Sequence, residues 1–308
     1  MSVPAEPSFD REAPEAAGVA VELASGLVRL IAPNASPYTF TGTCSYVFGK
    51  SQLTIIDPGP QDDTHLARLL ALIDGRPVEQ ILITHTHKDH SPLARDLAQV
   101  TGAAILGAAP HHFARPLREG EALWLDASVD TEYRPDRELV DGDRIMADGM
   151  AIETVATPGH TMNHLCFAVP ERRILFSGDH VMAWSTSIVA PPDGAMGAYL
   201  RSLQKLIDIG AGFDLFLPGH GKPVRQPQRF TRALLGHRLA REAAILDRLA
   251  AGDDTTASIV SMLYPVLDAR LIGAARLSVL AHLEELIAQN KVQAQGEGGL
   301  AGRFSLVR

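Results

Sequence analysis

The stretch Thr84-His85-Thr86-His87-Lys88-Asp89-His90 decides how this chain is interpreted. It follows the continuous apolar run 78–83, which predicts a buried strand. Three imidazoles and a carboxylate therefore leave one loop within six residues, and these are groups that zinc and iron bind in proteins. With 12 histidines in 308 residues, such a cluster arises by chance in about one chain in a thousand. The pattern predicts a metal site, and histidines that merely cap a helix are the weaker alternative.

Three further candidate ligands each follow an apolar run and a glycine. Glycine lets the backbone turn sharply, so each side chain can be delivered toward a shared cavity. With the cluster they give seven ligands, enough for two metal ions with a shared oxygen and open positions. They are His160 in Thr157-Pro158-Gly159-His160-Thr161, Asp179 in Ser177-Gly178-Asp179-His180, and His220 in Leu217-Pro218-Gly219-His220-Gly221.

The rest of the first two thirds alternates short strands with helices. This interleaving predicts helices packed outside one or two sheets, an α/β (α+β) class. Residues 1–18 lack an apolar period and are predicted to form a flexible N-terminal arm. The apolar spacing predicts strands at 28–31, 44–48, 53–56, 78–83, 103–106, 144–146, 151–155, 164–169, 173–177 and 215–217, and helices at 64–74, 92–100 and 196–209.

The last part of the chain has a different pattern. Helices are predicted at 229–251, 255–263 and 269–289, followed by a hairpin within 292–307. Three helices and a hairpin predict a small winged-helix-like domain. We therefore expect a catalytic domain at 19–228 and a winged-helix-like domain at 229–308. A unit of this size buries only a small core, so we expect it to dock on the catalytic domain.

Charge and composition exclude several classes of protein. The net charge of −8 divides into −12 for residues 1–221 and +4 for residues 222–308, so only the tail has the charge to bind phosphate. No apolar run is long enough to cross a bilayer, and the first twenty residues lack a signal pattern, which predicts a cytoplasmic protein. The only cysteines, Cys44 and Cys166, form no CxxC motif, which argues against a thiolate zinc site.

These motifs resemble the metallo-β-lactamase fold, an αββα sandwich whose strand-end loops hold one or two metal ions. The resemblance covers about residues 19–222. It implies that Asp57, on the turn after 53–56, orients ligand histidines from behind. It also assigns the seven ligands: His85, His87 and His160 to a first metal; Asp89, His90 and His220 to a second; Asp179 to the bridge between them.

Within that superfamily, aspartate at the bridging position resembles hydrolases of the glyoxalase II type, whereas true β-lactamases generally have another residue there. His87 excludes the flavodiiron pattern, and the short spacing between Asp179 and His220 excludes the RNA-cleaving branch with a large inserted domain. The phrases at 41–43 and 56–60, with the winged tail, look most like the β-lactamase-like protein 2 group. That group includes a single-strand-selective endoribonuclease. Cys44 and Ser45 stand where it commonly has Asn-Thr.

The resemblance implies a binuclear metal-dependent hydrolase in which a hydroxide bridging two metal ions attacks an ester, thioester or lactone bond of a small substrate. Asp179 would hold both ions, and Asp89 would orient the nucleophile or take its proton. Two alternatives stay open: a metal-dependent single-strand endoribonuclease, favoured by the basic tail, and a non-catalytic regulator that binds metal and nucleic acid. Zinc is the expected metal, and Fe and Mn also suit these ligands. A homodimer is compatible with the sequence.

The remaining polar residues carry weaker signals. His180 and Tyr199 are candidates to support Asp179 or to contact substrate. His164 falls within a predicted strand and is not counted as a ligand. His111 and His112 are expected in a solvated loop. In the tail, Arg270 and Arg276 are expected to lie on a solvent face, because aromatic residues for stacking on nucleic acid are scarce there.

Overall fold

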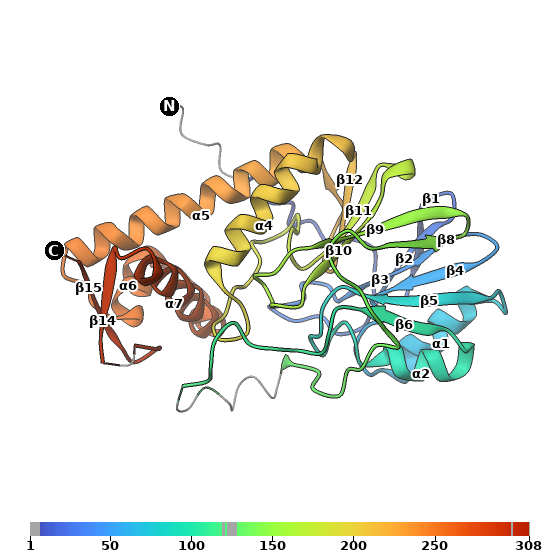
Figure 1. Ribbon diagram of the computed structural model, residues 1–308, viewed down its shortest axis with the longest axis horizontal. Coiled ribbons are helices and arrows are strands. Elements are labelled where there is room, and N and C mark those ends of the chain that lie inside the picture. Colours follow the sequence, from blue (N-terminus) through green and yellow to red (C-terminus); the bar gives the residue numbers. More distant parts are fainter. Residues whose placement is uncertain (1–6, 119–120, 122–127, 297, 308) are drawn as a thin grey trace.

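A computed structural model describes residues 7–118, 121, 128–296 and 298–307. Two β-sheets lie face to face, helices cover the outer face of each, and a smaller helical domain follows at the C-terminus (Figure 1). The predicted αββα sandwich with a small domain after it is confirmed. Among the described residues no helix is both long and apolar enough to span a bilayer.

The first sheet contains seven strands in sequence order. Its first four strands pair antiparallel and the strands from β4 to β7 pair parallel. The parallel part brings the carboxyl ends of several strands to one edge, where loops can converge. The strands are β1 (Ala20–Ala24), β2 (Leu27–Ile31), β3 (Cys44–Phe48), β4 (Leu53–Ile56), β5 (Val78–Ile83), β6 (Ala104–Gly107) and β7 (Arg137–Glu138).

The second sheet contains six strands in the order β13-β12-β11-β10-β9-β8. Only the β11–β12 pair is parallel, and helix α4 (Met196–Ile209) makes the crossover between these two strands. The sequence analysis missed β1, β7 and β13, which are short edge strands with partly polar sequences. The strands are β8 (Arg144–Ala147), β9 (Met150–Ala156), β10 (Leu165–Val169), β11 (Ile174–Gly178), β12 (Leu215–Pro218) and β13 (Val224–Arg225).

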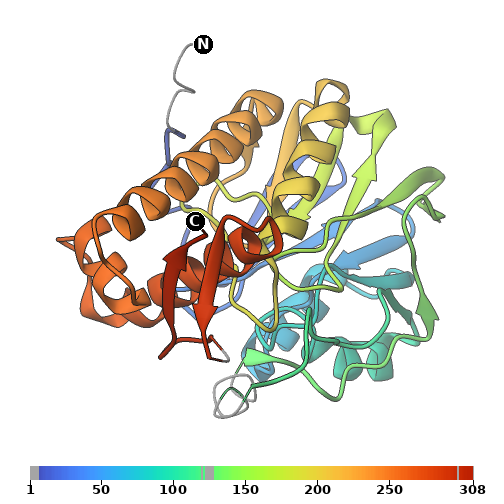
Figure 2. The same cartoon turned by 60° about the vertical axis from the view of Figure 1, so that its left-hand side comes forward.

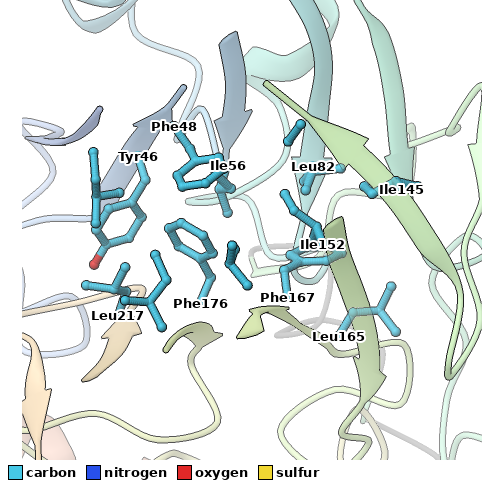
Figure 3. Close-up of a cluster of buried hydrophobic side chains, with 14 of the residues drawn as sticks. Tyr46, Phe48, Ile56, Leu82, Ile145, Ile152, Leu165, Phe167, Phe176 and Leu217 are labelled. Atoms are coloured by element: carbon cyan, nitrogen blue, oxygen red, sulfur yellow. The ribbon is translucent and has the colours of Figure 1, made fainter. Parts of the chain in front are cut away.

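A hydrophobic core fills the space between the two sheets (Figure 3). Phe176 of β11 makes edge-to-face contacts with Tyr46 and Phe48 of β3, with ring centroids 5.3 and 6.2 Å apart. The Tyr46 hydroxyl donates to the carbonyl of Pro218 at 2.7 Å, which also ties the sheets together. This core fixes the relative position of the two strand edges that carry the candidate ligands.

Two helices cover the first sheet: α1 (Asp63–Ile73) and α2 (Leu93–Thr101). Helix α1 begins where the Asp62 side chain accepts from the His65 amide at 2.7 Å, an N-cap that satisfies one of the free donors of the first turn. The second sheet is covered by α4 and by the long helix α5 (Pro227–Ala250). Short 3₁₀ turns lie at Pro170–Arg172, Gly210–Gly212 and Ala269–Leu271.

The C-terminal domain consists of helices α6 (Thr256–Leu263) and α7 (Ile272–Ala288) and the hairpin β14 (Val292–Gln295) and β15 (Arg303–Leu306), with α5 against them (Figure 2). It is docked, as expected, since α7 also packs on α4 of the catalytic domain. Arg115 forms an ion pair with Glu284 of α7 at 2.9 Å. The predicted boundary at residues 228/229 lies inside the first turn of α5, which runs from one domain into the other without a linker.

The described part of the N-terminal arm has no helix or strand. It nevertheless contacts the catalytic domain: the Asp10 amide donates to the Ala183 carbonyl at 2.9 Å, and Glu15 pairs with the buried Arg29. Both cysteines are buried free thiols.

Candidate metal centre

The seven predicted ligands lie together at one edge of both sheets. The loop Thr84 to His90 follows β5, and the other three ligands stand after β9, β11 and β12. Two backbone hydrogen bonds join the sheets at this edge, from the Leu165 amide to the Thr84 carbonyl at 2.7 Å and from the Cys44 amide to the Gly219 carbonyl at 2.7 Å. The candidate ligands therefore stand on loops at an edge where the two sheets are hydrogen-bonded to each other.

Three imidazoles form the first group. His85 Nε2 lies 3.2 Å from His87 Nδ1, and His160 Nε2 lies 3.0 Å from the same Nδ1 atom. The three ring nitrogens lie within 4.8 Å of one another, close enough to bind one metal ion as three histidines do in His₃ zinc sites.

The second group combines two imidazoles with carboxylates. Asp89 Oδ2 lies 3.4 Å from His90 Nε2 and 3.2 Å from His220 Nε2. Asp179 faces both groups, because its Oδ2 lies 3.2 Å from His220 Nε2 and 3.7 Å from His160 Nε2, while its Oδ1 lies 3.5 Å from His90 Nε2. Asp179 thus lies between the two groups.

Each of these five histidines has a partner for the ring nitrogen that points away from the centre. If that nitrogen carries the proton and donates it, the inward nitrogen keeps its lone pair, which is the tautomer that binds a metal ion. The outward contacts are His85 Nδ1 with Thr84 Oγ1 (3.0 Å), His87 Nε2 with Asp193 Oδ2 (2.7 Å), His90 Nδ1 with Asp57 Oδ2 (2.9 Å), His160 Nδ1 with the Ile188 carbonyl (2.6 Å) and His220 Nδ1 with the Gly42 carbonyl (3.2 Å).

Asp57 supports two ligands at once. Its Oδ1 accepts from the Thr84 amide at 2.8 Å, and its Oδ2 accepts from the Thr84 hydroxyl at 2.6 Å and from His90 at 2.9 Å. Through Thr84 it also orients His85. Asp57 has φ of 48°, in the left-handed region that few non-glycine residues adopt. Its buried carboxylate thus accepts three hydrogen bonds from residues of the loop 84–90.

Asp193 is a supporting residue that the sequence analysis did not find. It is 3% exposed and lies in the loop before α4, with Oδ2 on His87 and Oδ1 3.4 Å from His111 Nε2. His111 is therefore held against the site, contrary to the expectation of a solvated loop, whereas His112 is exposed. No spacing rule connects Asp193 with a histidine 106 residues earlier in the sequence.

Three other residues lie behind Asp179. His164, which was not counted as a ligand, accepts from the Asp179 amide at 3.2 Å through Nε2, while its Nδ1 lies 2.8 Å from Thr157 Oγ1. His180 is buried between His164 and Tyr199, with ring centroids 5.6 and 4.5 Å away. The Tyr199 hydroxyl donates to the His180 carbonyl at 3.0 Å. Tyr199 and His180 therefore pack behind the centre, which disfavours contact with substrate.

Electrostatics differ between the two groups. Burial lowers the pKa of His85 well below its usual value, and neighbouring imidazoles add to this effect. Burial likewise lowers the pKa of His160 to about 4. Burial also acts to lower the pKa of His220, but the carboxylates of Asp179 and Asp89 outweigh it and raise that pKa to about 9. Burial also acts to lower the pKa of His87, but the neighbouring Asp193 carboxylate outweighs it and raises that pKa. The first group therefore combines two rings whose pKa is lowered with one whose pKa is raised, and the second group is a place that attracts positive charge.

Glycine is required beside the ligands. A Cβ on Gly219 would lie 2.3 Å from Asp179 Oδ1 and 2.6 Å from His90 Cε1. At Gly178 the φ of 46° and a Cβ distance of 2.6 Å to His164 Nε2 exclude a side chain as well. Both glycines let the strand ends approach each other closely enough to bring the ligands together.

The donor set fits metal ions. Three inward-facing atoms are buried without a hydrogen-bond partner among the described residues: His90 Nε2, His220 Nε2 and Asp179 Oδ1. Buried polar atoms of this kind are costly unless something satisfies them, and neutral imidazoles with carboxylates are ligands for divalent ions. His85, His87 and His160 form one group able to hold an ion, and Asp89, His90, His220 and Asp179 form the other.

A sheet sandwich with a His/Asp cluster at one edge of both sheets defines a class of metal-binding αββα proteins. The chain belongs to the metallo-β-lactamase superfamily, whose pattern matches residues 38–220. Residues 255–301 match the β-lactamase-associated winged helix domain. The expected superfamily and the expected C-terminal domain are both confirmed.

Relatives extend over most of the chain. A β-lactamase-like protein 2 homolog of Drosophila melanogaster is 27% identical over 88% of this chain and 91% of its own length. An atrochrysone carboxyl ACP thioesterase of Aspergillus fumigatus is 27% identical over 73% of this chain and 65% of its own. A metallo-β-lactamase family protein from Thermus thermophilus has a TM-score of 0.72 and 25% identity, covering 93% of this chain and all of that one. A β-lactamase domain protein from Burkholderia ambifaria, at 23% identity, shares the fold with a TM-score of 0.80 over 98% and 97% of the two chains.

Proposed function

We propose that the protein is a binuclear metal-dependent hydrolase that cleaves an ester, thioester or lactone bond in a small substrate. The observation that carries this proposal is the position of Asp179, whose two carboxylate oxygens face the first and the second ligand group together. A single structural metal would not need seven converging ligands. The thioesterase relative supports the choice of an acyl substrate.

Two divalent ions held there would supply water activated at neutral pH and an electrophile for the scissile carbonyl. The chain's own residues would position this chemistry. Asp89 is the ligand most open to solvent, with 26% of its side chain exposed, compared with 15% for His87 and 9% for Asp179. We therefore expect substrate to approach from the side of Asp89, whose carboxylate would orient the attacking water and accept its proton.

Zinc is the proposed metal, because neutral imidazoles with carboxylates are typical of catalytic zinc sites. Iron and manganese accept the same ligands and are tested by measuring which ion the purified protein contains.

A single-strand endoribonuclease is the second candidate, since the tail carries the excess positive charge. Much of that charge is engaged within the protein. Arg276 donates to the Leu300 carbonyl at 2.9 Å, Arg270 pairs with Asp268 at 2.7 Å, and Arg238 is buried. Arg276 therefore lies partly inside the domain, where a solvent face was expected. These contacts favour the small acyl substrate over RNA, and the complete ligand set disfavours a non-catalytic regulator.

The test combines metal analysis with a parallel activity screen on a thioester, a lactone and a single-stranded RNA. We expect close to two metal ions per chain and turnover of an acyl substrate. Asp179→Ala should lower metal content and abolish hydrolysis together, because a carboxylate that faces two cations is lost. The control is Asp214→Ala, which removes an exposed aspartate paired with Arg173. This variant should retain the wild-type metal content and activity. Full activity in metal-free protein would refute the proposal. Cleavage of the RNA with no turnover of the thioester or lactone would favour the endoribonuclease over the acyl hydrolase.

A further inference from the structure

We propose that Arg238, on the helix that joins the two domains, is a positioning residue for the metal centre. It holds the segment 187–188, and that segment in turn orients His160 and the backbone of Asp179. The inference rests on the metal centre of the proposed function and extends it, because it gives the C-terminal domain a part in shaping the ligands.

The segment 187–188 touches the centre in two ways. The Ile188 carbonyl accepts the outward contact of His160 Nδ1 at 2.6 Å, so its position sets the orientation of that ring. The Ser187 hydroxyl lies against the carbonyls of Asp179 and His180, the latter at 2.9 Å. Ile188 therefore supports His160 of the first group, and Ser187 supports the backbone of Asp179 between the two groups.

This segment has no helix or strand of its own to hold it. Arg238 supplies that support from α5, because its Nη2 donates to the Ser187 carbonyl while its Nη1 donates to Ser278 Oγ of α7 at 3.3 Å. Arg238 is 4% exposed, and its guanidinium lies over the Tyr199 ring, 5.2 Å from the centroid. The planar guanidinium of Arg238 thus connects Ser278 of the C-terminal domain with Ser187 in the loop behind the metal centre.

A chain of contacts follows from these positions. Helix α7 and helix α5 fix Arg238, Arg238 fixes the Ser187 carbonyl, and the next carbonyl along the chain fixes His160. Losing Arg238 would free this loop and let the His160 ring rotate away from His85 and His87. Partners that orient metal ligands from outside typically change metal affinity by about 10- to 100-fold when removed. Arg238 touches no candidate ligand itself but holds the segment 187–188 that does. We therefore expect its loss to lower metal affinity by about tenfold, the lower end of this range.

The experiment compares full-length wild type with Arg238→Met after loading with Co²⁺. Affinity is measured by competition with a chelator, ligand geometry by the visible absorption of bound Co²⁺, and stability by thermal denaturation. We expect Arg238→Met to bind the ion about tenfold more weakly and to show an altered spectrum. Arg241→Met is the matched control: Arg241 lies on the same helix but stacks on Tyr264, 4.3 Å from its ring centroid. It should keep wild-type affinity and spectrum.

If Arg238→Met does not fold, Arg238→Lys serves in its place, because lysine keeps the charge and the packing but ends short of the Ser187 carbonyl. It should show the same loss of affinity. Wild-type affinity and spectrum in the folded variant, with only a lower melting temperature, would overturn the inference and leave Arg238 a structural residue. Failure of wild type itself to bind Co²⁺ would overturn the proposed function, so the two failures are distinguishable.

Discussion

At the scale of single residues, the centre depends on what lies behind each ligand. Five imidazoles present one nitrogen to the metal position and use the other for a contact with the scaffold. Asp57 stands out because its carboxylate accepts three hydrogen bonds, two from Thr84 and one from His90. This makes Asp57 the supporting residue whose loss should disturb both ligand groups.

Asp57→Asn should lower metal affinity by about 10- to 100-fold, because an amide replaces one of the two accepting oxygens with an NH₂ donor. That donor would then face either the Thr84 amide, or the Thr84 hydroxyl and the His90 ring. Affinity is measured by chelator competition. Asp74→Asn is a close control, because Asp74 has nearly the same backbone conformation, with φ of 49° against 48°, and is an exposed helix C-cap. A variant Asp57→Asn that retains metal as tightly as wild type would contradict this role.

The candidate ligands themselves could be predicted from sequence, because four of them stand in the one loop after the apolar run 78–83 and the other three each follow a glycine. The residues that support them could be predicted only in part. Asp57 was accessible through the resemblance, but Asp193 and His164 were not. Asp193 is 106 positions away from His87 in the sequence, and His164 lies at a strand end where a buried histidine has many other uses. Tertiary contacts between distant loops leave no local pattern.

At the scale of elements, most strands and helices followed from apolar periodicity, and those that were missed are short strands at sheet edges. Periodicity requires several turns or alternations, and β7 and β13 have two residues each. Helix α1 illustrates how an element is attached. Its His65 is buried, and Nε2 lies 2.9 Å from Ser45 Oγ of β3.

His65 should make stability depend on pH. Burial lowers its pKa from 6.5 to about 4, so between these values the unfolded chain binds more protons than the folded one. The free energy of unfolding is therefore unaffected by His65 above pH 6.5 and decreases as the pH falls below that value. The loss of stability is complete near pH 4, where it amounts to about 3 kcal/mol.

The measurement is the free energy of unfolding of wild type and His65→Gln from about pH 8 to about pH 4. Glutamine keeps a polar partner for Ser45 and removes the titration, so the difference between the two curves should change across that range. His112→Gln, at an exposed position, should run parallel to wild type. If the curve of His65→Gln also runs parallel to that of wild type, burial does not lower the pKa of His65.

At the scale of the whole molecule, the two domains share a hydrophobic cluster. Leu234 of α5 and Ala281 of α7 pack with Tyr199 and Leu203 of α4, all of them buried. This is why the tail is a docked unit, and it connects the domain that carries the ligands to the domain that follows.

Removing residues 230–308 should leave an insoluble or strongly destabilised catalytic domain, because the apolar face of α4 would be exposed to water. The measurement is soluble yield and melting temperature. A soluble truncated enzyme with unchanged activity on small esters, together with an isolated tail that binds RNA with steep salt dependence, would favour the endoribonuclease instead.

A graded version of the same test uses point variants of α5. Leu234→Ala should cost about 2 to 5 kcal/mol, the range for buried leucines, whereas Leu239→Ala, at a 49% exposed position, should change stability little. Denaturant unfolding of both variants beside wild type provides the comparison.

Turnover of a β-lactam reporter should be negligible beside that of simple esters or thioesters. Aspartate at position 179 adds negative charge between the two ligand groups and changes the room left for the carboxylate of a β-lactam. Steady-state rates on both substrate types, measured with the same metal-loaded protein, provide the comparison. Lactam hydrolysis at ordinary enzyme rates would contradict the expected resemblance to hydrolases of the glyoxalase II type.

The continuity of α5 has a mechanical consequence. With 24 residues it is about 36 Å long, and it begins beside the second sheet and ends inside the C-terminal domain. A flexible linker would let the domains swing apart and would insulate each from the other's fluctuations. A continuous helix is stiff, so bending or twisting at its C-terminal end is transmitted to its middle, where Arg238 meets the loop behind the candidate ligands. The position of the C-terminal domain and the position of the loop 187–188 are therefore set by one and the same helix.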